Sequence, residues 1–458
     1  MPFKYHPPTR AHCQVCEELS VSSPAPIIDV QNGKASAANN FPFHNWYSFV
    51  LGYTPLFPAY MIHREGITES HFVVDPFVGS GTTLIECKLR GIPSAGVDAN
   101  DYFVDAARVK LNWSVDVNKV KQARDTLLES ARQRFQHIDF CHNSNDLRLP
   151  IHPISMSAKE YAAKHRPKLL KERYISDESF TQAHIIKELI SEQIHEEPVQ
   201  RLFRLALASI LVPISNVRYG PGFGVVRPRK NNVDVLKLFT EKIDRMIADL
   251  ATVTDKQRET RADVYLGDSR NLSDYFSPNS VDFMITSPPY PGDHEYTKHS
   301  RLELLFMGYA NDLADIRRIK QRMIRGSTTN IYRHDDDSKY VRNFESIQAI
   351  VDVISRRLKE DGATSGFEKL YTKLVWEYFG GMYRVLRNVH EILKPHGKIT
   401  FLVSDSHAFK MVHIQTAKIL AEIGKAIGYS EYDIVLWQDK MSTSHKYNIK
   451  ENILTLVK

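Results

Sequence analysis

The stretch of sequence that decides the fold reads Asp75-Pro76-Phe77-Val78-Gly79-Ser80-Gly81-Thr82-Thr83. It follows a short β-rich run and precedes residues 82–90, where apolar side chains recur at helical spacing until Gly91. This pattern predicts a strand, a tight glycine turn and a helix. Glycines 79 and 81 allow the backbone to pass close to a ligand, and the start of the helix offers unpaired N–H groups. The turn is therefore a candidate ligand-binding loop.

A second strand is expected at Ala95-Gly96-Val97-Asp98, and it ends in a carboxylate. An acid at this place in a βαβ unit is suited to accept hydrogen bonds from the ribose hydroxyls of a nucleoside. A nicotinamide or flavin site is an alternative, but its fingerprint has a third glycine where this chain has Leu84. A glycine turn with a purely structural role is the other alternative that this motif alone leaves open.

A second motif, Thr286-Ser287-Pro288-Pro289-Tyr290, ends the apolar run at 280–285, about two hundred residues later. Two successive prolines hold the backbone extended, so the Ser287 hydroxyl and the Pro288 carbonyl become rigid hydrogen-bond acceptors. Acceptors on both N–H bonds of an aromatic amino group draw its nitrogen towards a reactive tetrahedral form. Tyr290 offers a ring on which a flipped base can stack. The alternative is a proline-rich loop that merely closes the strand.

With these two motifs the chain resembles the S-adenosylmethionine-dependent amino-methyltransferases of DNA, whose motifs read Asp-Pro-Phe-x-Gly-Ser-Gly-Thr and Ser/Asn/Asp-Pro-Pro-Tyr. The resemblance implies an α/β fold of the Rossmann-like class I methyltransferase type, with S-adenosyl-L-methionine as cofactor and double-stranded DNA as substrate. It implies that the target amino group is held by Ser287, Pro288, Pro289 and Tyr290. It implies that the cofactor is bound by Asp75, Phe77, Gly79, Gly81, Thr82, Asp98, Asp268 and Trp46.

Two of those cofactor residues come from looser matches. Asp268 lies in Leu266-Gly267-Asp268-Ser269, which resembles the strand end whose acid contacts the adenine of the cofactor. Trp46 lies in the segment 41–47, which resembles the stretch that lines the methionine end. Many family members with a Ser-Pro-Pro-Tyr motif place it before the cofactor motif, whereas this chain has the reverse order. Their target-recognition assignments therefore do not transfer.

The Ser-Pro-Pro-Tyr form is similar to that of enzymes that make N(4)-methylcytosine, so we expect that product, formed by direct transfer to a flipped base. N(6)-methylation of adenine is the alternative, because Asp in the first place is commoner there, and an RNA amino-methyltransferase is a weaker one. A non-catalytic nucleic-acid-binding relative is disfavoured because both motifs are intact. Methylation at carbon 5 is excluded because it needs a cysteine, usually after a proline, and the chain has no Pro-Cys pair. The family also implies restriction-modification, with a cognate restriction endonuclease as candidate partner.

The chain has 458 residues, which is long for one compact domain and leaves room for insertions. We expect a sheet of roughly seven strands with a largely helical insertion, the strands lying near 72, 95, 263–268, 281, 398–403, 434–437 and 452–457. The expected division is a loose N-terminal arm at 1–40, a split catalytic domain at 41–110 and 262–458, a mostly helical insertion at 111–261 and a second insertion with a basic stretch at 308–370. The helical insertion is the candidate target-recognition region.

Basic clusters point to DNA contacts, although the overall charge is only +6. The segment 218–230 is rich in Gly and Pro and predicts a flexible cationic loop that contributes Arg218, Arg227, Arg229 and Lys230. The segment 316–333 predicts a helix with one basic stripe made by Arg318, Arg322 and Arg325. The helical stretch around 164–173 is a third candidate. Each cluster has an ordinary solvated charged surface as its alternative.

The four cysteines form no even framework, and we find no secretory leader and no apolar run near eighteen residues. These features predict a cytoplasmic protein with no membrane contact, in which 202–214 is a core helix. Cys13 and Cys16 resemble half of a zinc site that Cys141 and His142 would complete, but the second pair lacks the usual spacing. We therefore predict no metal.

Overall fold

The structure is a computed structural model, and it describes residues 41–140, 156–219, 223–227, 229–230, 233–292, 294–362, 365–441 and 447–458. The expected N-terminal arm at 1–40 lies outside the described residues. So do Cys13, Cys16, Cys141 and His142, the residues weighed above as a zinc site.

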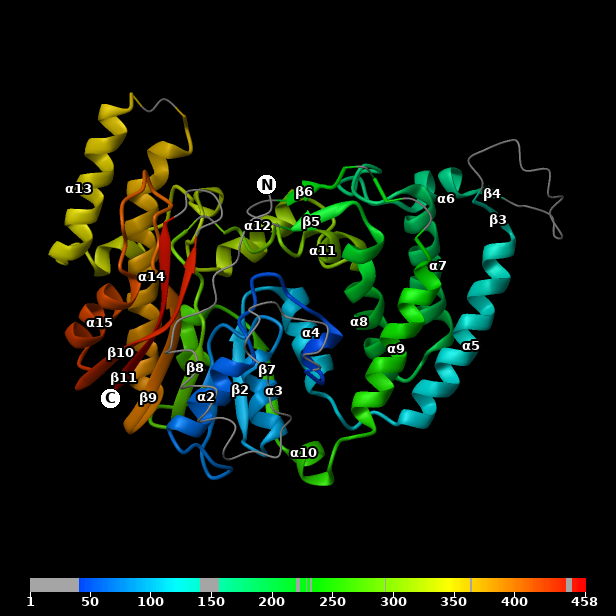
Figure 1. Ribbon diagram of the computed structural model, residues 1–458, viewed down its shortest axis with the longest axis horizontal. Helices are drawn as coiled ribbons and strands as arrows, with labels where there is room; N and C mark the ends of the chain where they lie inside the picture. The colour runs from blue at the N-terminus through cyan, green and yellow to red at the C-terminus, as the bar shows by residue number, and fades with distance from the viewer. Residues whose placement is uncertain are drawn as a thin grey trace, which may run out of the picture.

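One seven-stranded sheet forms the centre of the fold, in the order β10-β11-β9-β8-β1-β2-β7 (Figure 1). The strands from β9 to β7 pair in parallel, whereas β11 runs antiparallel to both of its neighbours. The bounds are β1 Val73–Asp75, β2 Ser94–Asp98, β7 Ala262–Leu266, β8 Val281–Thr286, β9 Leu393–Ser404, β10 Glu431–Met441 and β11 Asn448–Val457. The seven predicted strands and the Rossmann-like α/β fold are confirmed.

The order of the chain reverses between β1 and β8, which lie side by side although about two hundred residues separate them. Val73 is in register with Phe283 and Val74 with Met284, so Asp75 and Thr286 end adjacent strands. Open α/β sheets bind their ligands outside the carboxyl ends of the strands at such a reversal. The two sequence motifs therefore meet at the edge where chemistry is expected.

Helices cover both faces of the sheet because the buried strands are apolar on both sides. In β9, Phe401 packs with α14 (Tyr371–Ile392) and α15 (Thr416–Ile427), and the next residue, Leu402, packs with α2 (Leu56–Arg64) and α3 (Thr82–Leu89) on the opposite face. This is the alternation that a strand imposes.

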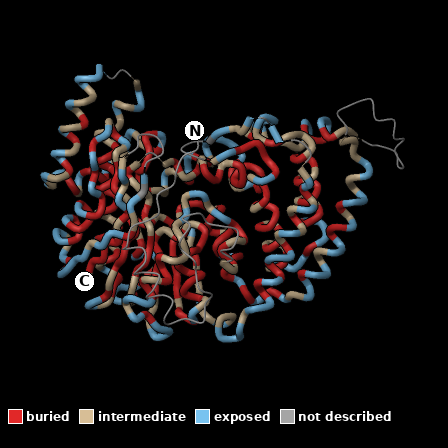
Figure 2. The backbone as a smooth tube through the Cα atoms, viewed as in Figure 1, coloured by how far each residue is buried: buried red, intermediate tan, exposed pale blue. Residues whose placement is uncertain are grey.

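Between β2 and β7 the chain forms a lobe of helices, which lies to the right of the sheet in Figure 1. Its helices bury their apolar faces in one shared core and expose their outer faces (Figure 2). The predicted core helix at 202–214 is part of α8. The elements are α4 Asp101–Leu111, α5 Val117–Gln136, β3 Ile138–Asp139, β4 Met156–Ser157, α6 Ala158–His165, α7 Asp177–Gln193, α8 Glu197–Ile214, β5 Val217–Tyr219, β6 Phe223–Val225, α9 Val235–Leu250 and α10 Asp255–Glu259.

The remaining elements are short, apart from α13. They are the 3-10 helices η1 His44–Trp46, η2 Ser269–Asp274, η3 Thr328–Asn330, η4 Asp337–Tyr340 and η5 Glu368–Leu370, together with α11 Arg301–Met307, α12 Leu313–Arg322 and α13 Glu345–Glu360. Within the described residues, no helix has both the length and the apolar character needed to cross a membrane.

Candidate active site

A pocket of about 800 Å³, its open mouth included, lies where β1 and β8 end. Both sequence motifs line it, together with the end of β2. The predicted site residues that the structure brings together around the pocket are Phe77, Gly79, Thr82, Asp98, Ser287, Pro288, Pro289 and Tyr290.

The glycine turn has the conformation that its sequence predicts. Gly79 and Gly81 adopt φ values of +51° and +91°, in the left-handed region that side chains disfavour. Gly81 is the N-cap residue of α3, so the first amide groups of that helix begin directly after the turn. Gly81 does not itself line the pocket, and its role is to let the chain pass from loop to helix.

Asp98 closes the turn from the end of β2. Its Oδ2 accepts a hydrogen bond of 2.8 Å from the amide of Gly79, and its Oδ1 accepts one of 2.8 Å from the amide of Asn100. Burial raises the pKa of Asp98 to about 6, although these two amide hydrogen bonds oppose the rise. A partly desolvated carboxylate at the rim of the pocket is a strong hydrogen-bond acceptor for hydroxyl groups.

Asp75 does not line the pocket but lies beneath it, where it joins the two motifs. Its Oδ1 accepts hydrogen bonds from the Phe77 amide at 2.9 Å and from the Thr286 hydroxyl at 2.6 Å, while Oδ2 accepts one from the Tyr53 hydroxyl at 2.9 Å. The side chain is fully buried, and this desolvation raises the pKa of Asp75. Asp75 therefore sets the relative position of the glycine turn and of strand β8, which leads into the Ser-Pro-Pro-Tyr motif.

The Ser-Pro-Pro-Tyr motif is held by the neighbouring strand and by α14. The Ser287 hydroxyl donates to the carbonyl oxygen of Leu402 in β9 at 3.0 Å, and the Tyr378 hydroxyl donates to the carbonyl oxygen of Pro289 at 2.9 Å. The Tyr290 hydroxyl lies 3.1 Å from Ser287 Oγ. Because a hydroxyl has one proton, donation to Leu402 leaves the lone pairs of Ser287 Oγ as acceptors.

Sequence reasoning missed Glu451, which completes this arrangement from β11. The Tyr290 hydroxyl donates to Glu451 Oε1 at 3.2 Å, and the Gln438 amide of β10 donates to Glu451 Oε2. Glu451 is buried. No motif marks it, and the only signal in the sequence is an acid directly before the strand predicted at 452–457. Sequence reasoning also missed further lining residues, among them Phe49, Tyr53 and Tyr296, and it assigned the lining residue Arg322 to DNA contact.

Trp46 and Asp268 lie elsewhere than expected. The indole of Trp46 is fully buried and donates to Asp249 Oδ2 at 2.8 Å, while the pocket wall is formed by the residues just after it, which include Phe49, Leu51, Gly52 and Tyr53. Asp268 is turned towards Arg270 in a hydrogen-bonded ion pair, and the next residue, Ser269, lines the pocket instead. Each match therefore points to the correct segment, but the pocket is lined by neighbouring residues.

The predicted basic stripe is split because α12 ends at Arg322. Arg325 lies beyond the helix end, is buried and pairs with Asp335 at 2.9 Å, so it holds the structure together and presents no charge to DNA. Arg322 donates to the carbonyl oxygen of Ala99, pairs with Asp101 and lines the pocket. Arg318 is exposed and pairs with Asp315 of its own helix. Arg325 is thus removed from the candidate DNA contacts.

The other basic segment forms the β5–β6 hairpin and the chain after it. Arg218, Arg227 and Arg229 are exposed, and Arg229 is 3.3 Å from Glu172. The ammonium group of Lys230 donates to the carbonyl oxygens of Val212 and Pro213 at the end of α8. A surface hollow beside the hairpin is lined by three arginines and three other side chains, namely Arg173, Tyr174, Val225, Val226, Arg227 and Arg229. These exposed arginines remain candidates for contact with phosphates.

A buried carboxyl group connects this hairpin to the catalytic segment. Glu303 of α11 accepts hydrogen bonds from Tyr219 of β5 at 2.8 Å and from Tyr47 at 3.1 Å. Burial raises the pKa of Glu303 to about 7. The hairpin is thereby attached to the helix that follows the catalytic loop.

Several known methyltransferases are similar to this chain. No family model matches the chain. The chain is similar to the Type II methyltransferase M.BsoBI of Geobacillus stearothermophilus, with 23% identity over 438 residues that cover 89% of this chain and 82% of the relative. It is also similar to the Type II methyltransferase M.AvaI of Anabaena variabilis, with 22% identity over 90% of this chain and 83% of the relative. A third relative is the Type II methyltransferase M.MvaI of Kocuria varians, with 22% identity over 77% of this chain and 73% of the relative.

These similarities extend over most of both chains, and the fold is the one that the two strand-end motifs predict. A methyltransferase needs a methyl donor, and residues of both motifs line one pocket. Over most of its length the chain is thus similar to Type II methyltransferases, and this similarity supports a DNA methyltransferase.

Proposed function

We propose that this protein transfers a methyl group from S-adenosyl-L-methionine to the 4-amino group of cytosine in double-stranded DNA. The amino group of adenine is the alternative target, and an RNA base is a weaker one. The Type II names of the relatives support a role in restriction-modification, beside a restriction endonuclease that reads the same site. The reaction would take place in the cytoplasm.

The main support for the proposal is that the Ser287 hydroxyl already donates its proton within the protein. Its proton is engaged by the carbonyl oxygen of Leu402, so its oxygen can only accept. An exocyclic amino group donates two hydrogen bonds, and Ser287 Oγ with the carbonyl of Pro288 would supply the two acceptors. Because the prolines hold both acceptors in place before substrate arrives, little reorganisation is needed during methyl transfer.

Glu451 has a supporting role in this scheme. Burial raises the pKa of Tyr290 well above its usual value, so the phenol keeps its proton. If that proton pointed at Ser287 Oγ, it would compete with the substrate for the acceptor. Donation to Glu451 removes the competition, so Glu451 keeps Ser287 available and fixes the ring of Tyr290 for stacking. Glu451 is thus a positioning residue.

The residues around the first motif fit the proposed cofactor. The carboxylate of Asp98 would accept from the ribose hydroxyls, and the amide groups at the start of α3 would face the carboxylate of the methionine portion. When bound, S-adenosyl-L-methionine supplies an electrophilic methyl group on a sulfonium centre. One pocket lined by both motifs allows that group and the amino nitrogen to be held in contact, and such alignment lowers the barrier without a covalent intermediate.

The DNA would approach from the side of the β5–β6 hairpin, and the helical lobe would contribute to target recognition. The exposed Arg218, Arg227 and Arg229 support this direction, and Arg173 lines the same hollow. Positive side chains here would contact phosphates, and these contacts add a salt-dependent part to the affinity. A base must leave the duplex to reach Ser287, and stacking on Tyr290 would offset part of that cost.

The deciding experiment is mass spectrometry of nucleosides from plasmid DNA that was purified from cells expressing the chain. Cells that express Ser287→Ala, at a matched protein level, are the control. N(4)-methylcytosine that appears only with the intact chain is the expected result. Detection of N(6)-methyladenine would mean that the mechanism holds but that adenine is the target base. A modified base found only in RNA would refute the proposal of a DNA substrate.

A further inference from the structure

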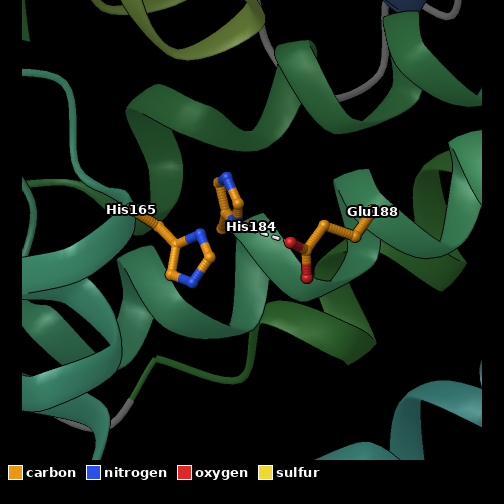
Figure 3. A group of neighbouring side chains, drawn as sticks. All are labelled: His165, His184 and Glu188. Carbon is orange, nitrogen blue, oxygen red and sulfur yellow. Dashed lines mark ion pairs between the residues drawn. The ribbon is translucent and has the colours of Figure 1, made fainter.

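Two imidazole rings and a carboxylate come together in the helical lobe, outside the pocket described above. Figure 3 shows His165, His184 and Glu188 gathered between α6 and α7. One donor atom from each residue lies within 4.8 Å of the others, and His184 Nδ1 is 3.8 Å from Glu188 Oε1. All three residues are partly buried. The distance of 3.8 Å is too long for a hydrogen bond.

The spacing suits a metal ion better than a direct contact. Zinc binds histidine nitrogen and carboxylate oxygen at about 2.1 Å, so two ligands of a tetrahedral site lie roughly 3.4 Å apart. His184 and Glu188 are four residues apart on α7, which places them on one helix face. His165 ends α6 and brings the third donor from a separate helix. Two histidines and a carboxylate are a donor set that first-row transition metals favour.

Neighbouring side chains hold these donors in place. The Tyr161 hydroxyl donates to Glu188 Oε2 at 2.6 Å, so its 3.1 Å contact with His184 Nδ1 is donated by that ring nitrogen, whose proton leaves when a metal ion binds there. The Tyr161 ring stacks on His165 with centroids 4.4 Å apart. Phe180 stacks on His184 at 5.5 Å. Arg134 lies 3.8 Å from Glu188 Oε2, but it makes its shorter ion pair with Glu192. Metal sites commonly have such partners around the ligands, because they orient the ligands before binding.

We propose that His165, His184 and Glu188 bind a divalent first-row transition metal ion, of which Zn²⁺ fits the donor set best. Three protein donors leave one tetrahedral position for water. The ion joins the end of α6 to the middle of α7 and stabilises the helical lobe. It takes no part in methyl transfer, because neither helix contributes a residue to the catalytic pocket. The proposed site uses none of the chain's cysteines and does not depend on the proposed function.

The test uses the full chain, stripped with a chelator, dialysed and titrated calorimetrically with Zn²⁺. One equivalent is expected to bind, with affinity reduced at least ten-fold in His165→Ala, in His184→Ala and in Glu188→Gln. Two controls should bind as the unaltered chain does. One is His195→Ala, which removes an exposed histidine between α7 and α8, and the other is the double variant Cys13→Ser with Cys16→Ser.

Two further measurements separate a lost ligand from a damaged fold. Zn²⁺ should raise the melting temperature of the unaltered chain but not that of Glu188→Gln, whose metal-free circular dichroism spectrum should match the unaltered one. X-ray absorption of the Zn²⁺ form should show only nitrogen and oxygen neighbours. Sulfur neighbours, loss of binding in the cysteine variant, or unchanged binding in all three ligand variants would refute the proposal, as would the absence of a stoichiometric site.

Discussion

The two motifs of the pocket are held in different ways. The glycine turn is fixed mainly by groups close to it in sequence, since Asp75 binds the Phe77 amide and Asp98 binds the Gly79 amide. The Ser-Pro-Pro-Tyr motif is fixed by groups more than eighty residues away, namely Leu402, Tyr378 and Glu451. The glycine turn thus has local hydrogen bonds of its own, besides those from Ser269 and Thr286, whereas the Ser-Pro-Pro-Tyr motif depends on the sheet and on α14.

This difference predicts that variants of the two sides separate cofactor binding from turnover. A change on the base side should affect the rate and leave cofactor affinity unchanged. A change at Asp98 should do the reverse. Changes at Asp75, Thr83 or Thr286, which join the two sides, should affect both.

The largest effect is expected for Ser287→Ala. Loss of a preorganised partner in a reacting site typically lowers the rate by about 10²–10³-fold, and we expect a fall of that size in kcat. Cofactor affinity, measured by calorimetry, should stay within about two-fold of the unaltered value, because Asp98 and the glycine turn are untouched. A variant with full turnover would show that the Ser287 hydroxyl is not an acceptor for the amino group.

Asp98→Ala is expected to weaken cofactor binding by about 10–100-fold, because hydrogen bonds to a charged group contribute roughly 1.5–3 kcal/mol. At saturating cofactor, kcat should remain close to that of the unaltered enzyme. Calorimetry gives the affinity, and Glu451→Gln is the matched control on the base side. Equal loss of cofactor affinity in both variants would contradict the separation of the two sides.

Glu451→Gln should lower kcat by about ten-fold, because the amide can donate to Tyr290 and turn the phenol proton towards Ser287 Oγ. A second change, Tyr290→Phe, removes that proton and should restore part of the lost rate in the double variant. The measurement is single-turnover methylation of a short duplex by all four forms. Purely additive losses in the double variant would rule out competition for Ser287.

Cofactor affinity should depend on pH through Asp98. Its pKa is raised to about 6 in the ligand-free protein, so the carboxyl group is mostly protonated below that pH. Ribose hydroxyls favour the ionised form, hence binding lowers this pKa and the affinity rises as pH increases through about 6. The expected change is at most ten-fold per pH unit, with a plateau above pH 7. Calorimetric titrations from pH 5 to pH 8 would measure it, and Asp98→Asn should lose the dependence.

The smallest effect is expected for the hairpin arginines. Arg227→Ala and Arg229→Ala should each weaken DNA binding only a few-fold, and each lost phosphate contact should reduce the salt slope by roughly 0.9. Fluorescence anisotropy at several salt concentrations provides the measurement. Lys418→Ala, an exposed position on α15, is the control and should change neither value. An unchanged salt slope in both arginine variants would show that the hairpin is not part of the DNA-binding surface.

Much of the fold was predictable because its signals are local. Apolar runs at strand period and the glycine turn identified seven strands, and the placement of two motifs at strand ends identified the pocket. The misplaced side chains show the limit of such signals. Trp46 and Asp268 are each a few residues from side chains that line the pocket. Their hydrogen-bond partners, Asp249 and Arg270, turn them away from it.

Arg325 shows the same limit for charge. Helical spacing placed it on one stripe with Arg318 and Arg322, but α12 ends before it. Its guanidinium group then donates to carbonyl oxygens near the helix end and pairs with Asp335. A pattern of charges indicates which residues share a helix face only as far as the helix continues.

By itself, the sequence determined the two motifs and the chemistry that they predict, because the glycine turn, the prolines and the candidate acceptors are properties of consecutive residues. Tertiary structure alone decided which distant side chains contact those residues. Glu451 meets Tyr290, and His165 meets His184 and Glu188, only after strands and helices far apart in the chain have packed. The physical reason is that a hydrogen bond or a metal ligand set depends on distances of a few ångströms, and sequence spacing specifies such distances only within a single turn, helix or strand.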